Sequence, residues 1–123
     1  MSILLRIAAV VSLVWAVLLL GLKEGVIAAE QITPVVIALA NELAIANVAL
    51  GYMFWHAARD PAANRGAIYG GIALMVLKTA NDLYEMLVLL PPGIALVSLG
   101  DLVVSVALLV GLLEALPRTL GPK

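Results

Sequence analysis

The sequence contains no cysteine and a single histidine, His56. The lack of cysteine excludes disulfide bridges, thiolate metal ligands and a thiol nucleophile within the chain. One histidine excludes a histidine-rich metal centre or a bis-histidine haem site built by one chain. The motifs of phosphate loops, dinucleotide-binding turns, zinc proteases and serine hydrolases are also lacking. We therefore expect neither a bound metal nor another cofactor.

Charged residues are scarce as well. They make up 12% of the 123 residues, whereas 64% are hydrophobic, and the mean hydropathy is +1.15. Soluble domains are roughly half apolar and a quarter charged, so this composition indicates an integral membrane protein. The net charge of −1 argues against a nucleic-acid partner, which requires a basic surface. At this length we expect one domain, residues 1–123.

Four apolar stretches are separated by short polar breaks, and each is near the ~20 residues that a helix needs to cross ~30 Å of hydrocarbon. They cover residues 3–22, 33–57, 66–90 and 92–116. Thr33 before Pro34 is typical of a helix N-cap, Arg59-Asp60-Pro61 and Pro91-Pro92-Gly93 are typical of turns, and Pro117 predicts the end of the last helix. The sequence therefore predicts an all-α, four-helix transmembrane bundle.

The distribution of basic residues predicts the orientation. With four spans, both termini and the turn near residue 60 share one side, which carries most of the basic residues: Arg6, Arg59, Arg65, Arg118 and Lys123. The opposite side has Lys23 alone, beside two glutamates. The positive-inside rule then places both termini in the cytoplasm. The same bias argues against the dual topology of small multidrug transporters.

Two local features carry a resemblance to a known family. Leu4-Leu5-Arg6 opens an apolar helix, and Arg59-Asp60-Pro61 precedes a glycine-rich third helix. In these features and in size, the chain resembles small bacterial four-helix membrane proteins of the DoxX-like type. The resemblance implies a bacterial cytoplasmic membrane location, and it carries over no functional residue.

Three acids lie in three different apolar stretches: Glu42, Asp82 and Asp101. Counted from the helix ends at 1.5 Å per residue, all three lie roughly 12–14 Å below the outer membrane surface. A charged side chain at that depth costs at least ~2.5–3.5 kcal/mol, so such residues face a protein interior and mark a candidate site. We expect the three side chains to point inward towards a common region.

Further polar residues extend this candidate site. Lys78, Asn81, Asp82 and Glu85 follow helical spacing and are expected on one face, and Asn41 precedes Glu42. The four acids and one lysine leave a formal charge of −3 in a low-dielectric place. We therefore expect either that at least one acid is protonated at neutral pH or that a cationic ligand lies among them. The predicted binding residues are Asn41, Glu42, Lys78, Asn81, Asp82, Glu85 and Asp101.

A purely structural interpretation stays open. Lys78 and Asp82, four residues apart, are spaced for an ion pair within one helix, and the asparagines are suited to interhelical hydrogen bonds worth ~0.6–2 kcal/mol each. Gly66 and Gly70, next to Gly71, predict close helix packing. Carboxylates on three helices exceed what structural hydrogen bonding requires, which favours a site.

Three functions fit these observations. The first is binding or transfer of a small amphiphilic or cationic molecule, with or without coupling to protons, for which so small a chain is expected to form a homodimer. The second is an intramembrane enzyme that isomerises, cyclises or opens an epoxide in a lipophilic substrate, with Glu42, Asp82 and Asp101 as catalytic acids and bases. The third is an accessory or scaffold subunit of a larger membrane complex.

Overall fold

The computed structural model describes residues 1–21, 32–89 and 92–120, with side chains in these ranges except for residues 89 and 92–98. Four helices follow one another: α1 (Ser2–Gly21), α2 (Pro34–Ala57), α3 (Arg65–Tyr84) and α4 (Pro92–Leu120). A π-helical turn, Glu85–Leu89, directly continues α3. The predicted all-α class with four helices is confirmed.

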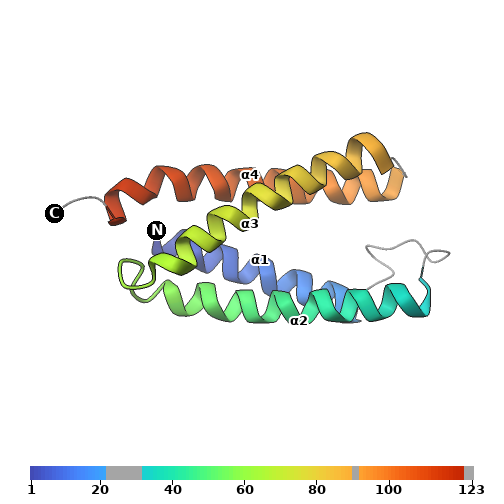
Figure 1. The fold of residues 1–123 in the computed structure, drawn as a ribbon, viewed down its shortest axis with the longest axis horizontal. Helices are drawn as coiled ribbons and strands as arrows, with labels where there is room; N and C mark the ends of the chain where they lie inside the picture. Colours follow the sequence, from blue (N-terminus) through green and yellow to red (C-terminus); the bar gives the residue numbers. More distant parts are fainter. Residues whose placement is uncertain (22–31, 90–91, 121–123) are drawn as a thin grey trace.

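The helices form two antiparallel pairs, α1 with α2 and α3 with α4, and α3 runs obliquely between α4 and the first pair (Figure 1). The start of α1, the turn at residues 58–64 and the last turn of α4 lie at the same end of the molecule, which we term the turn end (Figure 1). Because the chain runs along the bundle axis an even number of times, α4 ends at the same end of the molecule at which α1 begins.

The helix boundaries follow from the local chemistry that the sequence displays. The Thr33 hydroxyl accepts a hydrogen bond from the Val36 amide at 3.3 Å, and Pro34 occupies the first helical position, as predicted. The prediction that Pro117 ends the last helix is wrong, because α4 continues to Leu120. The fixed φ of proline is compatible with a helix, but Pro117 has no N–H to donate to the carbonyl four residues earlier, so α4 lacks one hydrogen bond there.

Three segments of the described chain are long and apolar enough to cross a membrane, judged by length and composition: α1, α2 and Leu99–Leu120 of α4. The third helix is not among them. Lys78, Asn81 and Asp82 lie close together near its end and lower its mean hydropathy.

The apolar core is divided along the bundle axis. At the turn end, side chains from all four helices pack together, among them Leu5, Phe54, Ile68 and Leu112. Towards the opposite end a second cluster of the described side chains joins α1 and α2, through Ala16, Leu19, Ala40 and Ala44. The four-helix core therefore stops near Met75 and Leu108, and polar residues of α3 and α4 follow.

Close approach of helices depends on one glycine of α3 rather than on the predicted pair. A Cβ atom added at Gly71 would lie 2.9 Å from Cε1 of Phe54, whereas Cβ atoms at Gly66 and Gly70 would meet no atom within 4 Å. The predicted packing at Gly66 and Gly70 is therefore not found among the described residues. Gly71, one residue further, is the position that faces the core.

This difference between neighbouring glycines gives the first testable prediction. Gly71→Ala is expected to lower the free energy of unfolding by about 1–3 kcal/mol, because the ring of buried Phe54 must move. Gly70→Ala is the matched control and is expected to be neutral or stabilising by up to ~1 kcal/mol, since alanine favours the helix. Thermal unfolding in detergent micelles measures both variants. Equal effects at the two positions would contradict the packing described.

Candidate functional site

The polar residues of α3 and α4 meet because the two helices are antiparallel and in register. Gly71 lies opposite Leu112 in the apolar core, where a Cβ on the glycine would be 3.9 Å from a leucine methyl carbon. Three turns further along α3, Asp82 lies within electrostatic range of Asp101, which is three turns back along α4. The same register that builds the core therefore brings the two aspartates together.

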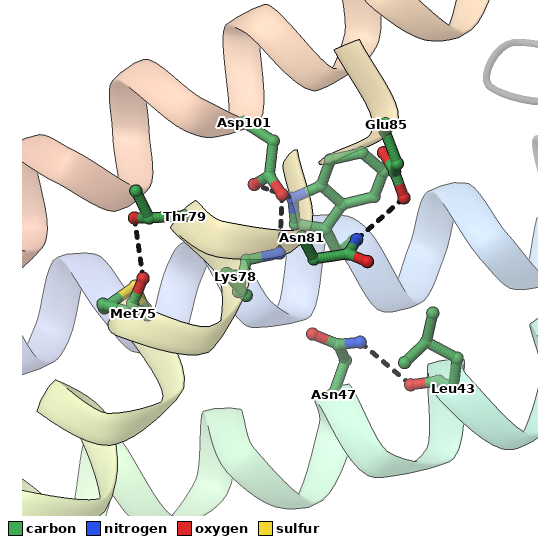
Figure 2. A network of polar contacts seen from close by, with 9 residues as sticks. Leu43, Asn47, Met75, Lys78, Thr79, Asn81, Glu85 and Asp101 are labelled. Carbon is green, nitrogen blue, oxygen red and sulfur yellow. Dashed lines mark hydrogen bonds and ion pairs between the residues drawn. The ribbon is translucent and has the colours of Figure 1, made fainter. Parts of the chain in front are cut away.

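Asp101 joins three helices. Its side chain is 7% exposed, and its Oδ2 atom accepts a hydrogen bond from Nζ of Lys78 on α3 at 2.6 Å (Figure 2). Its Oδ1 atom accepts one from Nε1 of Trp15 on α1 at 3.1 Å. The Lys78 ammonium also lies 5.7 Å from the centre of the Trp15 ring. A buried ion pair with a third hydrogen-bond partner is the arrangement in which a charge-assisted bond is strongest.

Asp82 lies within hydrogen-bond reach of Asp101 and is the less satisfied of the two aspartates. It is 4% exposed, and its Oδ2 atom is buried without a hydrogen-bond partner among the described residues. Lys78, one turn earlier on the same helix, pairs with Asp101 across the helix interface. The intrahelical Lys78–Asp82 pair that the sequence allows is thus not formed. A buried oxygen left without a donor costs about 1–3 kcal/mol, so this position is suited to accept a donor from elsewhere.

The other predicted residues of α3 are turned away from this centre. Asn81 is exposed, and its Nδ2 atom donates to Oε1 of half-buried Glu85 at 2.8 Å (Figure 2). Glu85 still lies within electrostatic range of Asp82. The predicted face is therefore divided: Lys78 and Asp82 face α4, whereas Asn81 and Glu85 pair at its edge.

The predicted inward orientation of Glu42 is wrong. Glu42 is exposed, and among the described residues it has no hydrogen-bond or ion-pair partner. The buried positions of α2 include Ala40 and Ala44, each two residues from Glu42 and hence about 200° around the helix. Asn41, the neighbour of Glu42, is half-buried. The described part of α2 therefore brings no acid to the site.

Two further hydroxyl and amide groups are satisfied within single helices. Thr79 donates to the carbonyl of Met75 at 2.7 Å, and Asn47 donates to the carbonyl of Leu43 at 2.9 Å (Figure 2). Ser105, one turn from Asp101 on the same face of α4, is 1% exposed, and its hydroxyl has no partner among the described residues. Ser98 precedes Asp101 by three residues in the sequence, and its side chain is outside the described residues.

Trp15 is a site residue that the sequence analysis did not select. One signal was present: an indole N–H in the middle of an otherwise apolar helix needs a hydrogen-bond acceptor. The register that directs it to Asp101 of α4 is a tertiary property, so the partner was not predictable.

The role of Trp15 can be tested against the only other tryptophan. Trp15→Phe is expected to lower the free energy of unfolding by about 1–3 kcal/mol, because Oδ1 of buried Asp101 loses its donor. Trp55→Phe is the control, since Trp55 is exposed, and its effect is expected to stay within about 0.5 kcal/mol. Thermal unfolding compares the two. An equal loss in both variants would exclude a specific role for the indole of Trp15.

An apolar groove of about 320 Å³ lies between α1 and α4, and Trp15 and Asp101 of this site form part of its lining. It is lined by Val10, Val11, Val14, Trp15, Leu18, Gly100, Asp101 and Val104. Trp15 and Asp101 supply its polar groups, and a Cβ at Gly100 would meet no atom within 4 Å. Its volume is within the roughly 300–1,000 Å³ typical of small-molecule sites.

The chemistry available here is that of two buried carboxyl groups, one ammonium and one indole. No three metal-ligating side chains come together in the described parts of the chain. The chain matches no family model, no curated protein and no solved structure. The resemblance to DoxX-like proteins therefore stays a prediction.

Proposed function

We propose that this chain is a small integral membrane protein, with both termini in the cytoplasm, that binds a small amphiphilic molecule in the groove between α1 and α4. Three apolar helices of sufficient length and the large apolar side chains exposed along all four helices support the membrane location. The basic residues Arg6, Arg59 and Arg65 lie near the turn end, which supports a cytoplasmic position for it.

One observation carries the binding proposal: Asp101 lines the apolar groove, and next to Asp101 lies buried Asp82, whose Oδ2 atom has no hydrogen-bond partner among the described residues. Asp82, Asp101 and Lys78 sum to a formal charge of −1. A cationic or hydrogen-bond-donating head group is complementary to that charge, and the valine-lined walls are complementary to an alkyl chain. A site that was purely structural would have no need of an unpaired carboxylate oxygen.

The test compares variants of the full chain in nonionic micelles against alkyl amines, alcohols and carboxylic acids. A ligand-dependent rise in melting temperature is expected for the unaltered chain. The rise is expected to be lost in Asp82→Asn and in Gly100→Leu, whose side chain is expected to occupy the groove, since a Cβ atom at Gly100 meets no atom within 4 Å. Glu114→Gln is the control, because Glu114 is exposed and lies more than three turns from Asp101 on α4. Identical shifts in all four proteins, or no shift with any compound, would exclude this function.

A second candidate function is association with another chain, and the exposure of Glu42 favours it. Glu42 lies roughly 5 Å from the midpoint of α2 at 1.5 Å per residue, where lipid penalises a carboxylate. Copies that share one orientation place Glu42 at the same depth, and two carboxylic acids are self-complementary as donor and acceptor. We propose a homodimer in which α2 packs on α2 of a second copy.

The absence of cysteine makes this association easy to test. A single Ala46→Cys substitution lies one turn from Glu42 on the same exposed face of α2. Oxidation in membranes is expected to yield a disulfide-linked dimer for Ala46→Cys. Val106→Cys, on an exposed position of α4, is expected to stay monomeric. Equal cross-linking at both positions would contradict a specific α2 contact.

A further inference from the structure

We propose that the ammonium group of Lys78 occupies a site that can bind an ammonium ion of a ligand. The ligand is an alkylammonium ion, which displaces Lys78 from Asp101. The released lysine then pairs with Asp82. This inference rests on the proposed groove function and names its substrate class. It is carried by the positions of Lys78, Asp82, Asp101 and Trp15.

The surroundings of the Lys78 ammonium are those that recognise ammonium ions in general. A carboxylate oxygen of Asp101 lies 2.6 Å from Nζ, and the ring centre of Trp15 lies 5.7 Å from it. A carboxylate combined with an aromatic face attracts primary and quaternary ammonium groups by charge and by the ring quadrupole. The chain's own lysine thus shows where a cationic head group fits.

A ligand and Lys78 reach this point from different sides. The groove approaches Asp101 and Trp15 between α1 and α4, and its remaining walls are valines, Leu18 and Gly100. Lys78 extends from α3 and is not part of the groove lining. An alkyl chain that lies in the groove therefore directs its head group at Asp101, where it competes with Lys78.

Asp82 provides the alternative partner for the displaced lysine. It is four residues from Lys78 on the same helix, a spacing that allows an ion pair, and its buried Oδ2 atom is unpaired in the described structure. The Lys78 side chain is 31% exposed, which leaves room for rotation. Glu85, bonded to Asn81, is a further acid within reach of Asp82. After the exchange, each aspartate is paired with one ammonium group. The formal charge of Asp82, Asp101 and Lys78 is −1, and the bound ligand brings the sum to zero.

The first measurement uses two probes of the same chain length, decylammonium and decanol, with the full chain in nonionic micelles and concentrations expressed as mole fractions. Decylammonium is expected to bind at least about tenfold more tightly than decanol, and Asp101→Asn is expected to remove that difference. Equal binding of the two probes overturns this inference but leaves the groove function in place. If neither probe binds, the groove function fails as well.

A double-mutant cycle separates exchange from simple charge attraction. We compare the factor by which Asp82→Asn weakens decylammonium binding in two backgrounds, with Lys78 and with Lys78→Gln. The factor is expected to be at least about tenfold larger with Lys78, because only a displaced lysine needs Asp82 as its acceptor. The glutamine amide can still donate to Asp101, which favours folding of the variant. If Asp82→Asn weakens binding by the same factor in both backgrounds, Lys78 does not move to Asp82 and the exchange is excluded. Should Lys78→Gln not fold, the comparison of the two probes still decides whether the site selects an ammonium.

Discussion

Lys78→Met is expected to lower the free energy of unfolding by about 1–3 kcal/mol, because the buried Asp101 carboxylate loses its half-buried ammonium partner. The Lys78 ammonium lies 2.6 Å from Asp101, and buried Asp82 lies beside them. Without Lys78, two carboxyl groups remain in a poorly hydrated place with no counter-ion. Unfolding of the full chain in detergent micelles, followed by circular dichroism, measures the loss.

A second substitution is expected to restore the stability that Lys78→Met removes. In the double variant Lys78→Met, Asp101→Asn, the charge that lost its partner is also removed, so most of the lost stability is expected to return. Arg65→Met is the control for loss of a positive charge at an exposed position, with an expected change within about 0.5 kcal/mol. A double variant no more stable than Lys78→Met would show that the ion pair is not the source of the loss.

Phe54→Ala is expected to lower the free energy of unfolding by about 2–3 kcal/mol, mainly through the cavity it leaves. Phe54 is 2% exposed and lies in the four-helix core at the turn end, against Gly71. In the proposed membrane location the loss is expected to be smaller than in soluble proteins, because helices that are surrounded by lipid gain little from the hydrophobic effect when they pack.

The neighbouring residue supplies the control for this prediction. Met53 is 50% exposed, and Met53→Ala is expected to change the stability by no more than about 0.5 kcal/mol. The same unfolding experiment compares the two variants. Similar losses at Phe54 and Met53 would mean that the helices do not pack through the face described.

The number, type and limits of the helices were largely predictable because they depend on local chemistry. Apolar runs of sufficient length, the Thr33 cap and the turn at Arg59-Asp60-Pro61 act within a few residues of the chain. The prediction at Pro117 is wrong because a proline removes one N–H donor from a helix but does not always end it, and α4 extends to Leu120. The π-helical turn after Tyr84 has no sequence signal that we can identify.

The sequence by itself determined the helical class, the apolar composition suited to a membrane, and the unusual set of polar residues at similar helix depths. The tertiary structure alone decided which of them meet. Rotation of α2 about its axis turns Glu42 outward, and the register of α3 and α4 places Lys78 against Asp101 rather than Asp82. The contact of α1 with α4 adds Trp15. Depth follows from counting residues along one helix, but direction depends on how the faces of several helices pack, which no single segment encodes.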